Sequence, residues 1–397
     1  MFEAIRGGRC RIRRGLIALF VFGALLAVEA TQHAAPPVSP RAVIPPAQNF
    51  PINAKWVQTG QGRLPMPPGT PAAHASSLLV MPPGHRCALM AFWFAGSRES
   101  APDVQVAQSC FMRSTQAWTE AAFVVNRQEM GKLLGFGLRR LGNPVAWLDA
   151  NGRVHLFVVA TGPGGWASSR VLHVRQNNPP AEAQKVVFNA PRILPLAWGW
   201  NLSHLVRGAP LALEDGGMVL PAYFELGIKY PVALRFDENG EFTGAARMSG
   251  RKNILQPTLI PLNARHWLAL MRDTRIGGKI AVAQTADGGQ TWRDLDDLGL
   301  SNPDSSVFAT TLGPWHFLLA HNSSPRSRQV LDLSESGNGI DWRRIHTLAK
   351  DDVASDGATG KAAEFSYPAM VWAEGKLWVS YTEQRTHIAW QRFEMEK

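Results

Sequence analysis

The sequence predicts an all-β protein, a six-bladed β-propeller of four-stranded antiparallel blades. Three observations predict it: short apolar runs recur in pairs, tight-turn residues separate the partners, and two related turn motifs lie one repeat apart. A single stretch, Glu120–Leu141, resembles a helix, and its glycines at 131, 135 and 137 weaken that interpretation.

The composition sets the class of protein. Of the 397 residues, 45% are hydrophobic and 18% are charged, which is enough apolar material for a large core and excludes intrinsic disorder. The formal net charge is +10, but the arginines are scattered rather than clustered. We therefore expect no nucleic-acid partner, and an acidic sugar or an anionic surface fits the charge at least as well.

The first 30 residues resemble a secretory signal. Five arginines precede the apolar run Gly15–Val28, and the small-residue site Val28-Glu29-Ala30 follows it. An uncleaved anchor is the alternative, and it would be the chain's one contact with a membrane. We expect a periplasmic or secreted protein with a Pro-rich linker over residues 31–50 and the propeller over residues 51–397.

Cleavage would leave two cysteines, Cys87 and Cys110, in two β-like runs on either side of a loop centred near residue 99. In a symmetric hairpin they would be cross-strand neighbours, so they are a candidate disulfide in an oxidising compartment. Two buried free thiols are the alternative.

From about residue 74 the chain repeats one scheme of paired strands, with turn residues such as Asn151-Gly152 between the partners. Six pairs are expected: 76–81 with 86–95, 145–149 with 154–161, 202–206 with 218–224, 258–262 with 267–271, 306–311 with 315–320, and 369–372 with 377–381. The chain ends after the third strand of the sixth unit. A strand at Ile52–Thr59 is expected to complete that blade, and a tandem of β-sandwiches is the alternative fold.

Two turns match the Asp-box pattern S/T-x-D-x-G-x-x-W. The first contains Thr285, Asp287, Gly289 and Trp292, and the second is a shortened variant with Ser336, Asn338, Gly339 and Trp342. The two tryptophans are 50 residues apart, one blade. The side chain of Asp or Asn binds the backbone of its own turn, glycine takes the positive-φ position, and tryptophan packs between strands. These residues are predicted to be structural.

In a propeller, the loops into first strands and the loops between second and third strands share one end of the axis, and Asp-boxes lie at the other. This places polar residues from all six units around the opening at the first of these two ends, which we call the mouth. They include His74, Asp103, Asn143, Asn201, Glu225, Gln256, Asp304, Glu364, Tyr367, Arg98, Glu99, Arg272 and Arg385. Arginine pairs with carboxylates and a carboxylic acid can transfer a proton, as a site for an acidic sugar requires.

Structural roles remain open for some of these residues. Arg272 could pair with its neighbour Asp273, and Asn143, Gln256 and Asp304, each beside a proline, could cap strand starts. The sequence contains no HExxH motif, Cys/His cluster or EF-hand loop, so we predict neither a metal nor a cofactor.

Several segments resemble the BNR/Asp-box sialidase superfamily, and most closely its bacterial exo-α-sialidase-like or neuraminidase-like group. Besides the two Asp-boxes, they are Trp93–Glu99 with Pro102–Val104, Asn201–Ser203, Leu255–Pro257 and Glu364–Pro368. The resemblance spans about residues 74–395. It implies a six-bladed propeller and a retaining glycosidase that acts on terminal acidic sugars of glycans.

The resemblance also implies roles for individual residues. Tyr367 matches the nucleophile by position, Glu225 would assist it, and Asp103 would be the acid/base. Substrate would be bound by Arg98, Glu99, Arg272, Arg385, Asn201, Gln256 and Glu364. A neutral phenol suits an anionic substrate, because the sugar acid would repel a carboxylate nucleophile.

The sequence departs from the superfamily pattern at two places. The F-R-I-P segment is missing and His74 stands at the first strand entrance, while His321-Asn322 stand where a third arginine is expected. Two other functions therefore stay open. One is a polysaccharide lyase or other uronate-active enzyme with Tyr and His as base and acid, and the other is a non-catalytic carbohydrate-binding propeller.

Overall fold

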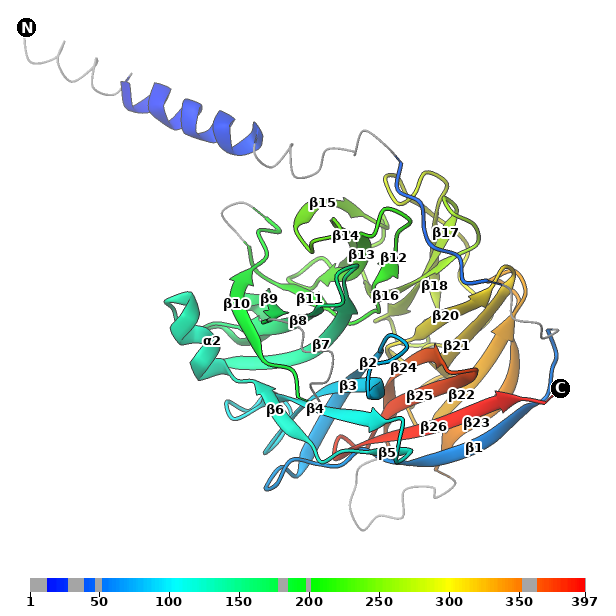
Figure 1. The fold of residues 1–397 in the computed structure, drawn as a ribbon. Helices are drawn as coiled ribbons and strands as arrows, with labels where there is room; N and C mark the ends of the chain where they lie inside the picture. The colour runs from blue at the N-terminus through cyan, green and yellow to red at the C-terminus, as the bar shows by residue number, and fades with distance from the viewer. Residues whose placement is uncertain are drawn as a thin grey trace, which may run out of the picture.

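The strands pair into six antiparallel sheets that follow one another around a central axis, as Figure 1 shows. The computed structural model describes residues 13–27, 39–46, 52–177, 185–197, 201–351 and 363–396. The predicted six-bladed β-propeller is confirmed within these residues. The expected cleavage site at residues 28–30 lies outside them.

The first three blades run from the inner to the outer strand in sequence order. Blade 1 consists of β2 (Ala72–Val80), β3 (Cys87–Gly96), β4 (Gln105–Met112), β5 (Ala117–Trp118) and β6 (Ala122–Val125). Blade 2 consists of β7 (Arg140–Leu148), β8 (Val154–Thr161), β9 (Ser169–Gln176) and β10 (Phe188–Ile193), with the 3₁₀ turn η1 (Gly165–Ser168). Blade 3 consists of β11 (His204–Val206), β12 (Leu211–Ala212), β13 (Met218–Phe224), β14 (Tyr230–Phe236) and β15 (Phe242–Arg247).

The last three blades complete the ring. Blade 4 consists of β16 (Ile254–Pro261), β17 (Trp267–Asp273), β18 (Ala281–Thr285) and β19 (Arg293–Asp294). Blade 5 consists of β20 (Phe308–Gly313), β21 (His316–Asn322), β22 (Val330–Ser336) and β23 (Arg343–Lys350). Blade 6 consists of β24 (Phe365–Ala373), β25 (Lys376–Glu383), β26 (His387–Met395) and β1 (Trp56–Arg63).

Strand β1 closes the ring, because it pairs with β26 as the outermost strand of blade 6. In Figure 1 the blue strand lies beside the red one, so the first and last strands of the propeller share a sheet. An N-terminal closing strand was expected at Ile52–Thr59, and the paired residues begin and end four residues later. Apolar contacts between blades support the closure, for example Phe111 of blade 1 against Trp378 of blade 6, with ring centroids 4.6 Å apart.

The stretch that resembled a helix is helical over eight residues only, α2 (Arg127–Leu134). Asn126 caps its start by accepting a hydrogen bond from the backbone N–H of Glu129, and Gly135 ends it in the left-handed conformation.

A second helix covers residues 13–27 and exposes apolar side chains such as Phe20 and Phe22. No helix in the described residues is both long and apolar enough to cross a membrane.

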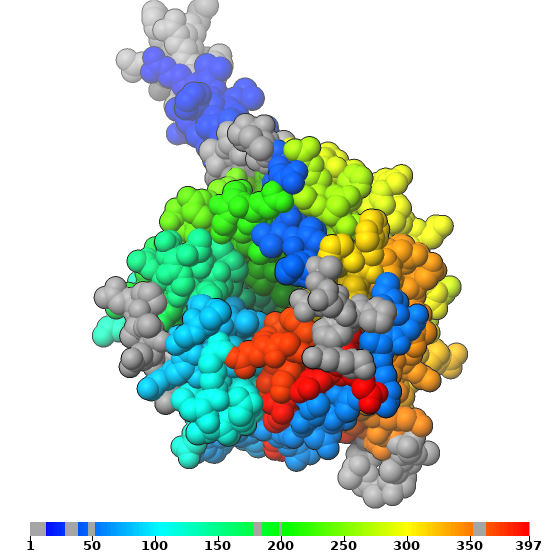
Figure 2. Space-filling model, turned by 45° about the vertical axis from the view of Figure 1, so that its right-hand side comes forward, coloured from blue at the N-terminus to red at the C-terminus, as the bar shows by residue number. Residues whose placement is uncertain are grey.

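Residues 39–46 lie against the Asp-box end of the propeller. Ser39 Oγ donates to the carbonyl of Asp287, Ala42 is buried, and the backbone N–H of Val43 donates to the carbonyl of Ala212. Figure 2 shows this blue segment at the centre of that face. Beside it opens an apolar cavity of about 440 Å³, whose lining includes Val43, Pro45, Leu259, Phe308 and Trp372.

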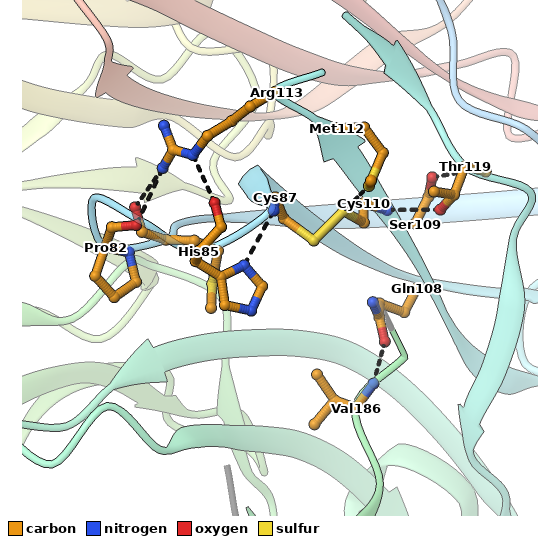
Figure 3. Close-up of a disulfide and its surroundings, with 11 residues drawn as sticks. Pro82, His85, Cys87, Gln108, Ser109, Cys110, Met112, Arg113, Thr119 and Val186 are labelled. Atoms are coloured by element: carbon orange, nitrogen blue, oxygen red, sulfur yellow. Dashed lines mark hydrogen bonds between the residues drawn. A yellow bond between two sulfur atoms is a disulfide. The ribbon is translucent and has the colours of Figure 1, made fainter. Parts of the chain in front are cut away.

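A disulfide joins Cys87 of β3 to Cys110 of β4, with the Cα atoms 5.6 Å apart (Figure 3). The two cysteines are not directly opposite in the ladder: Cys87 faces Met112, and a register shift follows it. Arg113 braces the preceding turn by donating to the carbonyl oxygens of His85 and Pro82. The disulfide therefore links the two strands of the second hairpin of blade 1, β3 and β4.

Candidate active site

Each blade carries one non-glycine residue with positive φ in, or shortly before, its innermost strand. They are Ala75, Asn143, Ser203, Gln256, Asp304 and Tyr367, with φ values from 32° to 57°. L-residues rarely adopt this conformation, and it costs free energy wherever it occurs. Its recurrence at one end of all six blades is therefore a repeated feature of this fold that positions residues at the mouth.

The same positions interrupt the strand pairing. The register shifts after His74 in β2, after Gly142 in β7, after Leu255 in β16 and after Ser366 in β24. A bulge of this kind redirects the side chain of the extra residue. The same local bulge thus directs side chains toward the mouth in several blades.

Gln256 connects the groups at the centre of this mouth. Its Nε2 donates to the hydroxyl oxygens of Tyr367 at 3.2 Å and of Tyr223 at 3.3 Å. Its Oε1 accepts from Arg272 Nη1 at 3.0 Å, and Arg272 Nε donates to Asp304 at 2.6 Å. Because a guanidinium can only donate, Arg272 orients the amide so that its N–H groups face the phenols.

The two tyrosines differ in their burial. Tyr223 is 2% exposed, and burial raises the pKa of its phenol, so it stays protonated. Tyr367 is partly exposed. Of the two, Tyr367 is therefore the phenol that a substrate could reach.

A second cluster surrounds Glu364. Arg385 donates to both of its carboxylate oxygens, at 2.7 and 3.1 Å, and Arg328 Nη1 and Ser366 Oγ donate to it at 2.8 and 2.7 Å. Arg385 also pairs with Glu99 of blade 1. Burial by itself would raise the pKa of Glu364, but the hydrogen bonds from Arg385 and Ser366 and the charge of Arg328 lower it to about 2.

Glu364→Gln is expected to lower the free energy of unfolding at pH 7 by about 3 kcal/mol, from a folded pKa near 2 against the ordinary 4.5. Because the folded pKa is depressed, this contribution is fully present above pH 4.5 and is lost as the pH falls toward 2. Urea titrations across that range should show the two proteins converging. Glu383→Gln is the control, because Glu383 pairs with the exposed Arg63 and should contribute little. Equal losses for both variants would contradict the expectation.

His74 lies against Tyr367, with ring centroids 4.2 Å apart, and against Phe94 at 5.4 Å. It is 2% exposed, and neither ring nitrogen has a hydrogen-bond partner among the described residues. Burial lowers the pKa of His74 well below its usual value, and the charge of Arg385 acts in the same direction. The imidazole is therefore neutral.

Glu225 follows β13 at the same mouth, and its carboxylate makes no hydrogen bond to Tyr367 in the described structure. Burial raises the pKa of Glu225, although the charges of Lys229 and Arg272 oppose the shift. The shift favours the protonated form of Glu225, in contrast to the lowered pKa of Glu364 at the same mouth.

Asp103 braces the loop between β3 and β4, where it accepts from the backbone N–H and the hydroxyl of Ser97 at 2.9 and 2.8 Å. Burial by itself would raise the pKa of Asp103, but these hydrogen bonds lower it.

Arg98 of the same loop is exposed and shares the lining of a small cavity with His74, Glu99 and Arg385. Asn201 instead donates to the carbonyl of Leu194 at 2.6 Å.

The Asp-boxes adopt the expected turns. Asp287 accepts from the backbone N–H groups of Gln290 and Thr291, and Asn338 does the same for Ile340 and Asp341. In both turns the tryptophan indole N–H donates to the glycine carbonyl, from Trp292 to Gly289 and from Trp342 to Gly339. No group of three or more His, Cys, Asp or Glu in the described residues could hold a metal ion.

Sequence reasoning missed three residues of the mouth: Arg207, Tyr223 and Arg328. Tyr223 lies in a buried strand and Arg328 in a polar loop, so neither stands out in the sequence. Arg207 directly follows the apolar run of β11, and an arginine at the end of a buried strand is a signal that could have been noticed. Its side chain is 3% exposed and its guanidinium carbon lies 5.3 Å from the centre of the Tyr367 ring.

Comparisons with known proteins agree with this architecture. The family model of the BNR repeat-like domain matches residues 87–379. No curated protein sequence matches the chain.

Solved structures share the fold at low sequence identity. The Hadza microbial sialidase Hz136 is 16% identical over 81% of this chain and 65% of its own, with a TM-score of 0.64. Trypanosoma rangeli sialidase in complex with the inhibitor DANA is 14% identical over 85% of this chain and 60% of its own, with a TM-score of 0.64. A protein of unknown function from Dyadobacter fermentans is 14% identical over 87% of this chain and all of its own, with a TM-score of 0.65. This chain thus spans less than two thirds of the length of either sialidase.

Proposed function

This chain belongs to the BNR repeat-like domain family, and from that premise we propose that it is a glycoside hydrolase of the sialidase type, acting on terminal acidic sugars of glycans. The observation that carries the proposal is the position of Tyr367. Its hydroxyl oxygen accepts a hydrogen bond from Gln256 at the axial mouth, and the positive charges of Arg272 and Arg385 interact electrostatically with the phenol. Such a phenol is suited to attack an anionic sugar.

The reaction would proceed by retention. Tyr367 Oη would give its proton to an assisting carboxylate and form a bond to the anomeric carbon while the glycosidic bond breaks, and a second carboxyl group in its acid form would give its proton to the departing oxygen. Water would then attack the anomeric carbon and give a proton to the carboxylate that had acted as the acid. The bond to Tyr367 breaks, and its phenolate takes its proton back from the assisting group. The resemblance assigns the acid/base role to Asp103 and the assisting role to Glu225. Of the two carboxyl groups, it is Glu225 whose pKa is raised, as a proton donor requires, whereas the pKa of Asp103 is lowered.

Arginines at the mouth would bind the sugar carboxylate. Arg385 and Arg328 already pair with Glu364, whereas Arg272 uses Nε and Nη1 and has no partner for Nη2 among the described residues. Arg272 and the exposed Arg98 are therefore the two cations best placed to bind the carboxylate of the substrate.

A lyase acting on uronates is the second candidate, because the neutral imidazole of His74 lies against Tyr367. In that reaction one of the two groups would remove the proton next to the carboxyl group and the other would protonate the leaving oxygen.

Export is also part of the proposal. The N-terminal segment has the pattern of a signal, and the Cys87–Cys110 disulfide suits an oxidising compartment such as the periplasm or the exterior.

One set of assays on the purified protein distinguishes these functions. Release of a fluorophore from a sialoside, or from another acidic glycoside, is the expected result. Appearance of an unsaturated uronate chromophore from a polyuronate would instead establish the lyase. Saturable glycan binding without either product would reject both and leave a carbohydrate-binding propeller.

A further inference from the structure

Arg207 is a buried cation beside the reactive phenol. Its Nη2 donates to the carbonyl of Pro368 at 2.6 Å and its Nη1 to the carbonyl of Ser76 at 3.4 Å. Burial lowers the pKa of Arg207 to about 10, which still leaves it charged at neutral pH. The backbone of blades 1 and 6 thus holds the guanidinium at the ring of Tyr367.

No carboxylate pairs with Arg207 in the described residues. Arg98 of the mouth is exposed to solvent, and three other arginines each have a carboxylate partner: Arg272 pairs with Asp304, and Arg328 and Arg385 pair with Glu364. A buried charge without a counter-ion is costly, and buried charges in proteins are as a rule paired. The groups that can offer Arg207 a negative charge are the phenols of Tyr367 and Tyr223, once ionised.

We propose that Arg207 is a positioning residue that supplies the counter-charge for Tyr367 when its phenol loses a proton. The guanidinium faces the ring and cannot itself take that proton, so it acts by stabilising the phenolate. The amide N–H of Gln256 acts in the same direction, because it donates to the phenol oxygen and can accept nothing from it. The effect of Arg207 on the ionisation of Tyr367 does not depend on the proposed function. Only the role of the phenolate as a nucleophile rests on that proposal.

Other charged and titratable groups also face Tyr367. His74 is neutral, Tyr223 stays protonated, and Arg272 and Arg385 are cations already paired with carboxylates. Arg207 is therefore the one cation of this group that has no carboxylate to offset its charge.

The chain has four tyrosines, Tyr223, Tyr230, Tyr367 and Tyr381, so the charge effect can be measured without a substrate. Tyrosine labelled with ¹³C at the ring carbon that bears the hydroxyl gives one signal per residue, and Tyr367→Phe assigns the signal of interest. In Arg207→Met that signal should titrate at a higher pH than in the wild type, with about a tenfold or greater fall in the ionisation constant. An unchanged titration would overturn the proposal.

Two further variants guard against indirect effects. Arg207→Lys keeps a positive charge and should restore most of the titration, whereas a purely structural role would leave it as perturbed as Arg207→Met. Arg235→Met removes another buried arginine, 6% exposed in β14, and should leave the Tyr367 signal in place. If Arg235→Met shifted that signal as far as Arg207→Met, the proposal would be rejected.

These experiments distinguish a failure of the Arg207 proposal from a failure of the proposed hydrolase function. A shifted titration in a protein that cleaves no glycoside would retain the role of Arg207 and reject the hydrolase. In an active enzyme, the rise of kcat with pH should move to higher pH in Arg207→Met while KM changes little. A lower kcat with an unmoved pH profile would contradict the proposal.

Discussion

Tyr367→Phe is expected to lower kcat by at least about 1000-fold, because it removes the nucleophilic oxygen and leaves only binding and electrostatic contributions to the rate. The ring contacts with His74 and Arg207 remain, so the fold should be unaffected. Steady-state kinetics on the best glycoside, with thermal unfolding measured in parallel, would show this.

The matched control is Tyr381→Phe. Tyr381 lies in the same blade, and its hydroxyl makes hydrogen bonds with the carbonyl of Leu348 and with Gln391, away from the mouth. That variant should keep near wild-type turnover. Near-normal activity of Tyr367→Phe would refute the nucleophile, and equal losses in the two variants would point to a structural cause.

Trp267→Ala is expected to lower the free energy of unfolding by about 4 kcal/mol, in the range for deleting a fully buried aromatic side chain. Trp267 is 0% exposed, and its indole N–H donates to the carbonyl of Ala264 at 3.0 Å. The ring also packs on Gly289 of the first Asp-box, where an added Cβ would approach it to 2.7 Å. The substitution therefore removes the surface on which this turn rests.

Trp315→Ala serves as the control for Trp267→Ala, because Trp315 is 55% exposed and lies in the turn between two strands of the next blade. Its effect should be within about 0.5 kcal/mol. Denaturant titration of both variants tests the pair. A loss below about 1 kcal/mol for Trp267→Ala would contradict the packing described for blade 4.

The fold could be predicted because its signals are local. Each blade depends on alternating apolar runs and on turn residues within about ten positions of one another, as in the Asn151-Gly152 turn between β7 and β8. The Asp-boxes are equally local, since Thr285, Asp287 and Trp292 bond within one turn. Even the closing strand could be anticipated, because the last blade lacked a partner, although its boundaries were displaced by four residues.

The mouth was predicted only in outline. Loop order predicted Gln256, Arg272, Glu364, Arg385 and Tyr367 at one end of the axis. In the structure Gln256 bonds both Tyr367 and Arg272, and Arg385 bonds Glu364. The pairing among them could not be foreseen: Tyr367 accepts a hydrogen bond from Gln256, and in the part of the chain that the structure describes no hydrogen bond links Tyr367 to Glu225. Several assigned substrate-binding residues, including Glu99, Arg385 and Glu364, bond one another.

The sequence by itself determined the blades, the turns and the end of the axis at which the polar loops gather, because these features arise from neighbours along the chain. Only the tertiary structure decided which charges meet, since Arg385 and Glu99 are 286 positions apart and Arg207 and Pro368 are 161 apart. Closing a ring of sheets sets those distances. A guanidinium that pairs with a carboxylate and one that lies against a phenol look the same in the sequence.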